Sequence, residues 1–133
     1  MTTRSGSIDP GAVLYLVAQL GLEETTEVLE RRSGLLALSG FSGDVRELER
    51  DPRGAFALDV YAYRVAQAVA ACAVALGGVD CLAFSGGIGE NSARVRDAVV
   101  AHLPFLAELD VRVVPAREDI VAAREVAAFL SAR

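Results

Sequence analysis

The sequence predicts a helix-rich α/β fold that contains a single β-α-β unit. Two short runs, Val79–Ser85 and Val111–Val114, have the length of strands, and the apolar composition of the first predicts that it is buried on both faces. An amphipathic helical segment, Ser92–Leu103, lies between them, and this order favours a parallel, right-handed crossover. Helical periodicity covers most of the remaining chain, so the expected sheet is incomplete. We therefore expect an exposed sheet edge and apolar helix faces that need cover from elsewhere.

The first part of the chain predicts two helices, a loop and a short third helix. Asp9 and Pro10 are typical of a helix N-cap and first helical position. A second helix is expected over about residues 24–32, and the stretch rich in Gly, Ser and Leu over residues 33–43 predicts a loop. Asp44 then caps a short helix.

The longest predicted element is a helix over Ala55–Leu76. Alanine, valine and leucine surround much of it, so we expect it to be buried or to form an interface. A closing helix is expected over Arg117–Leu130. Cys72 in the long helix and Cys81 in the first strand have neither C-x-x-C spacing nor a secretory context, which predicts two buried core thiols.

Composition limits the classes of function. The chain has 133 residues, room for one domain, and 53% of them are hydrophobic. A net charge of −5, without a basic cluster interleaved with aromatic residues, argues against a nucleic-acid partner. No run reaches the ~18 apolar residues of a membrane span, and the first residues lack the apolar region of a signal peptide. We therefore expect a cytoplasmic protein with no membrane partner.

Three glycines at the end of the first strand form the most informative segment. Gly86, Gly87 and Gly89 lack the Cβ atoms that would keep a phosphate from the backbone, and we expect a helix to begin at about Asn91. No Gly-Lys-Ser/Thr follows, and Ser92 stands where a dinucleotide motif has its third glycine. Taken alone, the segment fits a phosphate loop and a tight strand-to-helix turn equally well.

Five segments together extend this interpretation. They are Thr3–Gly11, Arg32–Gly40, Ser42–Leu48, Phe84–Ser92 and Val113–Asp119. Each resembles, in the same order, a motif of the acetate kinase family, which belongs to the sugar kinase, Hsp70 and actin superfamily. The resemblance implies a partial ribonuclease H-like, actin-type ATPase domain. Residues 1–133 would form one carboxyl-terminal nucleotide-binding portion, with the family's amino-terminal domain absent.

The resemblance also implies an activity. It implies reversible transfer of the γ-phosphoryl group of ATP to acetate or another short-chain carboxylate, which gives ADP and an acyl phosphate, with Mg²⁺ as cofactor. The implied partner is a second copy of the chain or a complementary amino-terminal subunit. His102 matches no catalytic position, so the isolated chain is expected to be inactive. The alternative is a truncated or split-gene module that binds nucleotide or dimerises without catalysis.

The resemblance nominates one catalytic residue, seven nucleotide-binding residues and one metal ligand. These are Arg4; Asp44, Val45, Arg46, Gly87, Ile88, Gly89 and Asn91; and Glu118. An arginine at position 4 would neutralise charge on the transferred phosphoryl group, because its planar fork stays ionised and meets phosphate oxygens in pairs. The alternative is a terminal arginine with no role.

The other nominated residues also have explanations that need no ligand. Asp44 can serve as an N-cap, and Arg46 can pair with Glu49 one turn later. Asn91 can cap the following helix, and Glu118 is favourable in the first turn of a helix.

Three positions depart from the family pattern. Ser7 replaces an Asp, and Arg117 replaces an Asn beside the expected metal ligand. The added positive charge of Arg117 could compete with a metal. Val45 replaces a bulkier Met or Phe, which could loosen a purine pocket.

Overall fold

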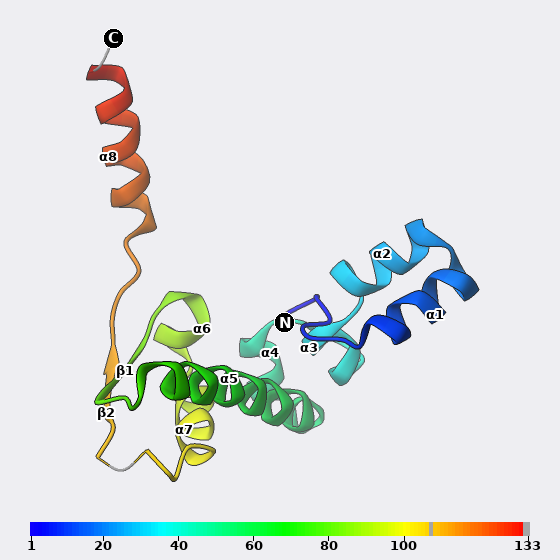
Figure 1. Ribbon diagram of the computed structural model, residues 1–133, viewed down its shortest axis with the longest axis horizontal. Helices are drawn as coiled ribbons and strands as arrows, with labels where there is room; N and C mark the ends of the chain where they lie inside the picture. The colour runs from blue at the N-terminus through cyan, green and yellow to red at the C-terminus, as the bar shows by residue number, and fades with distance from the viewer. Residues whose placement is uncertain (107, 132–133) are drawn as a thin grey trace.

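The computed structural model describes residues 1–106 and 108–131, and helices dominate it (Figure 1). In chain order the elements are α1 (Pro10–Leu20), α2 (Leu22–Arg31), α3 (Gly34–Ser39), α4 (Val45–Arg50), the 3₁₀ turn η1 (Pro52–Gly54), α5 (Ala55–Leu76), β1 (Cys81–Phe84), α6 (Gly86–Asn91), α7 (Ala93–Ala101), β2 (Asp110–Val113) and α8 (Glu118–Ser131). The predicted helix-rich α/β class with one β-α-β unit is confirmed.

The sheet consists of two parallel strands, β1 and β2, joined by a crossover through α6 and α7. Cys81 pairs with Asp110 and Phe84 with Val113. Only Phe84 of β1 is buried, and all four residues of β2 are exposed. The prediction of a first strand buried on both faces was therefore wrong, because the described residues supply no layer that covers the second face of this sheet. The expected exposed sheet edge is present.

The two cysteines differ from the prediction for the same reason. Cys72 in α5 and Cys81 in β1 are both exposed, so neither is a core thiol. Each lies in an apolar segment, and an apolar segment predicts buried residues. Which side of such a segment is covered depends on neighbours elsewhere in the chain.

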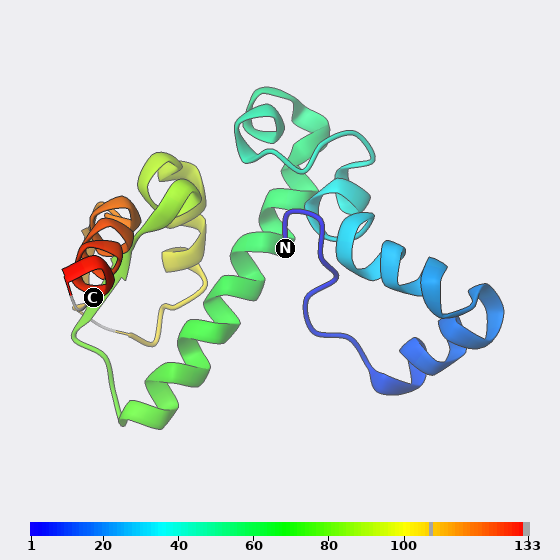
Figure 2. The same cartoon turned by 90° about the horizontal axis from the view of Figure 1, so that it is seen from above.

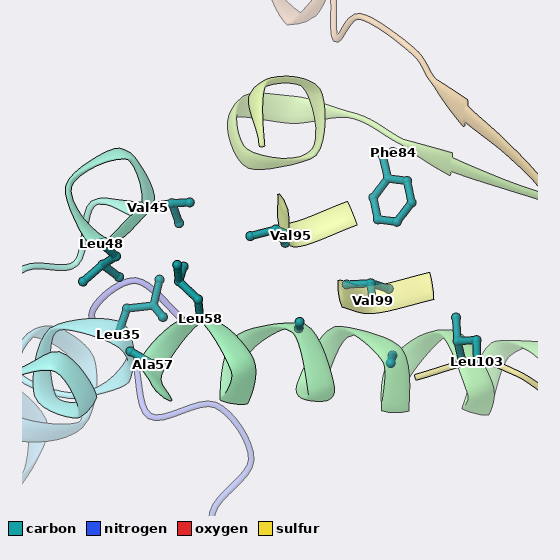
Figure 3. Packing of buried hydrophobic residues seen from close by; sticks show 11 residues of the cluster. Leu35, Val45, Leu48, Ala57, Leu58, Phe84, Val95, Val99 and Leu103 are labelled. Atoms are coloured by element: carbon teal, nitrogen blue, oxygen red, sulfur yellow. The ribbon is translucent and has the colours of Figure 1, made fainter. Parts of the chain in front are cut away.

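Helix α5 forms the spine of the molecule and has the predicted bounds. It lies between the group α1–α4 and the unit that contains the sheet (Figure 2). Its buried alanines, Ala62 at 0% exposed and Ala66 at 3%, let α7 approach closely. Around them a single core collects Leu35, Val45, Leu48, Leu58, Phe84, Val95, Val99 and Leu103 (Figure 3).

The same helix is long and apolar enough to cross a membrane. With η1 it spans Pro52–Leu76, 25 residues, and its most apolar window has a mean hydropathy of 1.2. A single helix of this kind is weak evidence for a membrane span, because the core helix of a soluble protein passes the same test. In this structure α5 packs against α3, α4 and α7, and 28% of that apolar window is buried.

The stretch expected to be a loop after α2 instead contains the short helix α3. The first residues of the chain lie across its beginning: the Leu35 N–H donates to the Met1 carbonyl at 2.8 Å, and the Leu36 N–H to that of Thr2 at 3.1 Å. Gly34 has a φ of +63°, and a Cβ there would collide with the Met1 carbonyl oxygen. These long-range bonds satisfy amides that otherwise lack partners at a helix start.

Large apolar side chains remain exposed on several elements. Leu14 and Leu22 of the α1–α2 pair are 71% and 72% exposed, and Val74 at the end of α5 is 83% exposed. Helix α8 has no buried residue and projects away from the rest of the chain (Figure 1). The expectation of apolar helix faces without cover is thus met over the described residues.

Candidate functional site

A cleft of about 600 Å³ is lined by residues of α4 and α6. Its lining residues come from two distant segments and from the beginning of the chain: Thr2, Gly43, Asp44, Val45, Arg46, Glu49, Gly87, Ile88, Asn91 and Ser92. Six of the seven residues nominated for nucleotide binding are among them, all except Gly89. The fold therefore brings together residues that the sequence separates by about forty positions.

The first wall of the cleft is the beginning of α4. Asp44 caps this helix by accepting from the Arg46 N–H at 2.9 Å, and the Arg46 guanidinium binds the same carboxylate through Nε at 3.1 Å and Nη2 at 2.5 Å. The hydrogen bond from the Arg46 side chain, followed by the one from its backbone, lowers the pKa of Asp44 to about 2. The Arg46 side chain is 78% exposed, so its planar face is open to a ligand. The alternative Arg46–Glu49 pair is not formed, because Arg46 pairs with Asp44 and Glu49 accepts from Ser92.

The second wall of the cleft is α6, and here the local structure differs from the prediction. The glycines form the helix α6 rather than an open loop, and the Gly86 N–H donates to the Glu90 carboxylate at 2.8 Å. That amide is therefore occupied rather than free for a phosphate. Ser92, not Asn91, caps the next helix, and the Asn91 side chain donates to the Gly87 carbonyl at 2.8 Å.

Two of the three glycines in α6 have different roles. A Cβ on Gly87 would meet nothing within 4 Å, which leaves this part of the wall open to the cleft. A Cβ on Gly89 would lie 3.3 Å from the Phe84 carbonyl carbon, so this glycine lets α6 pack against β1. Gly89 does not line the cleft, and its nomination as a cleft-wall residue is not supported by its position.

Arg4 lies outside the cleft lining but close to it along the chain. Thr2 lines the cleft, and a Cβ on Gly43 would lie 2.8 Å from the Thr2 carbonyl oxygen. Gly43 therefore allows the first residues to cross the beginning of α4. The Ser5 N–H donates to the Leu29 carbonyl at 2.9 Å, which fixes the chain on the other side of the exposed Arg4.

Glu118 does not line the cleft. It is the first residue of α8, which projects away from α4 and α6 (Figure 1). Its neighbour Asp119 pairs with Arg117 at 3.2 Å, which lowers the pKa of Asp119. Within residues 1–106 and 108–131 there is no group of three or more His, Cys, Asp or Glu side chains that could hold a metal. The described residues thus do not fit a metal site built by this chain alone.

His102 has a structural role in keeping with its lack of a catalytic match. It ends α7 as the C-cap residue, and its ring packs edge to face with Tyr63 of α5 at a centroid distance of 5.4 Å.

Four lining residues were not nominated from the sequence: Thr2, Gly43, Glu49 and Ser92. Glu49 lies one helical turn after Val45, and Ser92 follows Asn91 directly, so helical spacing and the preference for serine at an N-cap could have found both. No local signal marks Thr2, because its position depends on hydrogen bonds to α3.

Comparison with known proteins agrees with the resemblance. The profile of the acetokinase family matches residues 1–127. Acetate kinase from Rickettsia felis is 36% identical over 154 residues, an alignment that covers 98% of this chain and 40% of that protein. The chain thus spans about 40% of the length of this curated relative.

Solved structures show the same relationship. The crystal structure of acetate kinase from Porphyromonas gingivalis matches with a TM-score of 0.86 and 32% identity, over 98% of this chain and 40% of that one. A propionate kinase from Francisella tularensis matches with a TM-score of 0.79 and 30% identity, over 89% and 37%. The fold is therefore a partial actin-type ATPase domain, and the chain belongs to the acetokinase family.

Proposed function

We propose that this chain supplies the nucleotide-binding part of an acetate kinase-type phosphotransferase. The reaction would be the reversible transfer of the γ-phosphoryl group of ATP to acetate or a similar short carboxylate, which gives ADP and an acyl phosphate. One observation carries the proposal: the cleft unites the Asp44-Val45-Arg46 segment with Gly87, Ile88 and Asn91, residues that the family resemblance nominates separately.

The chemistry of the lining supports a nucleoside as the ligand. The Asp44 carboxylate can accept from ribose hydroxyl groups, and the open face of the Arg46 guanidinium can stack on a purine. Val45 and Ile88 provide apolar surface for the base, and Gly87 leaves the wall free of a side chain. This mixture of an apolar wall and a few polar groups is typical of small-molecule sites.

The phosphoryl end of the site would lie toward Arg4. A guanidinium there would neutralise charge on the group in transfer, which is most of what a protein contributes to such a reaction. The described residues do not form a Mg²⁺ site by themselves, and Glu118, the metal ligand that the resemblance implies, does not line the cleft. We assign no step to the metal.

A partner would complete the molecule. A second copy of the chain, or a subunit with the family's amino-terminal half, would cover the apolar faces of α1, α2 and α5. These exposed faces also favour the second candidate function, a module that binds nucleotide or dimerises without catalysis. Both candidate functions use the cleft for nucleotide, but only the phosphotransferase would form an acyl phosphate.

The sharpest test of the cleft compares two arginines with the same local geometry. Arg46 and Arg53 each bind the aspartate that caps their own turn, with Nε at 3.1 Å from the Oδ1 atom, but only Arg46 lines the cleft. We expect Arg46→Ala to weaken ATP binding about tenfold by calorimetric titration, as expected for a lost stacking and hydrogen-bonding partner. Arg53→Ala should leave the affinity unchanged. Equal losses in the two variants would exclude this cleft as the site.

A second measurement separates the two candidate functions. The isolated chain should form no acyl phosphate from ATP and acetate that hydroxylamine can trap, because it carries no match to the family's catalytic His. Turnover that depends on Arg4 in the isolated chain would contradict this expectation. Turnover that appears on addition of an amino-terminal acetate kinase domain would favour the phosphotransferase over the non-catalytic module.

A further inference from the structure

A single hydrogen bond joins the two walls of the cleft. The Ser92 Oγ–H donates to Oε1 of Glu49, a residue 43 positions earlier in the chain. Glu49 belongs to α4 and Ser92 begins α7, and both side chains line the cleft. Among the described residues, no other hydrogen bond or ion pair connects α4 with α6 or α7.

The serine hydroxyl is held from both sides. Ser92 is 4% exposed, and its Oγ also accepts from the Val95 N–H at 3.0 Å. The hydroxyl thus donates to α4 and accepts from α7. A buried hydroxyl with both functions satisfied has little freedom to rotate, so it defines the direction in which the carboxylate must lie.

The apolar contacts between α4, α5 and α7 do not by themselves fix the distance between the two walls of the cleft. Val45 from α4 and Val95 from α7 are buried on the same side of α5, with Leu58 below them (Figure 3). Apolar contacts of this kind are not directional, and helices can slide on them by small amounts. A hydrogen bond to a carboxylate is directional and stronger than a neutral one.

We propose that Glu49 and Ser92 are positioning residues that hold the two walls of the cleft at the spacing a nucleotide requires. The proposal rests on the proposed function, because it assigns the bridge to nucleotide binding. Neither residue needs to touch the ligand for this effect. Breaking the bridge lets α4 and α6 separate, so that a ligand contacts one wall at a time.

A double-mutant cycle with ATP as the probe tests the bridge. We expect Ser92→Ala and Glu49→Ala each to weaken binding about tenfold by calorimetric titration, the scale of a hydrogen bond to a charged group. The double variant should bind no more weakly than either single variant, because each change removes the same bridge. Glu49→Gln and Ser92→Thr keep the acceptor and the donor, and they should retain the affinity of the unchanged chain.

The loss of the Ser92 cap needs a control of its own. Asp9 caps α1 by accepting from the Ala12 N–H at 3.0 Å and does not line the cleft. Asp9→Ala therefore removes a comparable cap elsewhere and should leave ATP binding unchanged. Losses that add in the double variant, or single variants that fold and bind ATP normally, would overturn the proposal.

A readout without ligand distinguishes failure of this proposal from failure of the proposed function. If the unchanged chain binds no ATP, the proposed function is wrong and the nucleotide role of the bridge falls with it. Hydrogen exchange then still tests the coupling of the walls: Glu49→Ala should speed amide exchange in α7 as well as in α4, and Ser92→Ala in α4 as well as in α7. Exchange that rises only in the helix carrying the substitution would show that the walls are not coupled.

Discussion

The chain contains the pattern Asp-x-Arg at the start of two neighbouring turns, and only one of the two arginines lines the cleft. Asp44 with Arg46 and Asp51 with Arg53 form nearly identical capped turns, in which the aspartate accepts from the backbone N–H two residues later at 2.9 Å. Arg53 lies over the Phe41 ring, 4.7 Å from its centroid, whereas Arg46 faces the cleft. The pattern alone therefore does not identify a ligand site.

The ionisation of Asp44 provides a prediction at this scale. Arg46 lowers its pKa from the ordinary value of 3.8 to about 2 in the folded chain, so the contribution of Asp44 to stability is complete above pH 4 and is lost as the pH falls toward 2. Arg46→Ala should move the carboxyl titration upward, toward its ordinary range. An NMR titration of the Asp44 carboxyl carbon measures this shift, and an unchanged midpoint in the variant would show that the Arg46 side chain is not the cause.

The two inner glycines of α6 provide a paired prediction. Gly87→Val places a side chain in open space on the cleft wall, so it should weaken ATP binding with little effect on thermal unfolding. Gly89→Val forces its Cβ against Phe84, and we expect it to cost about 1–3 kcal/mol of unfolding free energy, the usual penalty of overpacking. Titration and denaturation of both variants measure the two effects. Loss of stability in Gly87→Val, together with loss of ATP binding but not of stability in Gly89→Val, would contradict the geometry.

At the scale of elements, one carboxylate ties α6 to the segment that precedes α8. Glu90 Oε1 accepts from the Gly86 N–H and from the Ala116 N–H, both at 2.8 Å. The beginning of the cleft wall is thus connected to the end of the sheet. Glu90 and Ala116 are 26 residues apart in the sequence.

Removal of that carboxylate should loosen both segments at once. We expect Glu90→Ala to lower the unfolding free energy by about 1–3 kcal/mol, because it leaves two amides without their acceptor. Amide exchange at Gly86 and Ala116 should rise together. Glu90→Gln keeps an acceptor oxygen and should retain most of the stability, and Glu125→Ala on the exposed face of α8 serves as a neutral control. A rise at only one of the two amides would disprove a shared acceptor.

At the scale of the whole molecule, exposed apolar surface is the dominant feature. A sheet of two strands and a long alanine-rich helix leave large side chains in water on α1, α2, α5 and α8. Soluble monomers rarely keep extensive patches of this kind. We therefore expect the chain to self-associate at micromolar concentration or to bind a hydrophobic dye.

The exposed end of α5 allows a defined test of that association. Val74→Glu replaces a side chain that is 83% exposed, so it should dissociate a dimer that uses this face without unfolding the chain. Gln67→Glu adds the same charge at an exposed polar position of α5 and serves as the control. Sedimentation velocity measures the outcome, and a monomer without dye binding in the unchanged chain would contradict the expectation.

Much of the local structure could be predicted from the sequence. The N-caps Asp9 and Asp44, the bounds of α5 and the parallel crossover between β1 and β2 all follow from signals within a few residues or from the order of elements. Caps and periodicity act through atoms one helical turn apart, so a sequence reader can evaluate them directly.

The remaining features depend on contacts between distant segments. Helix α3 needs the carbonyls of Met1 and Thr2, the cleft needs α4 opposite α6, and the bond from Ser92 to Glu49 joins residues that no local pattern connects. The exposure of Cys72 and Cys81 likewise depends on which faces find a covering layer. The sequence by itself thus determined most of the helices and the parallel pair, because these rest on local chemistry, and its resemblance to the acetate kinase family gave the candidate nucleotide residues. Only the tertiary structure decided which of those residues share a cleft, because burial and long-range hydrogen bonds exist only once distant segments have packed together.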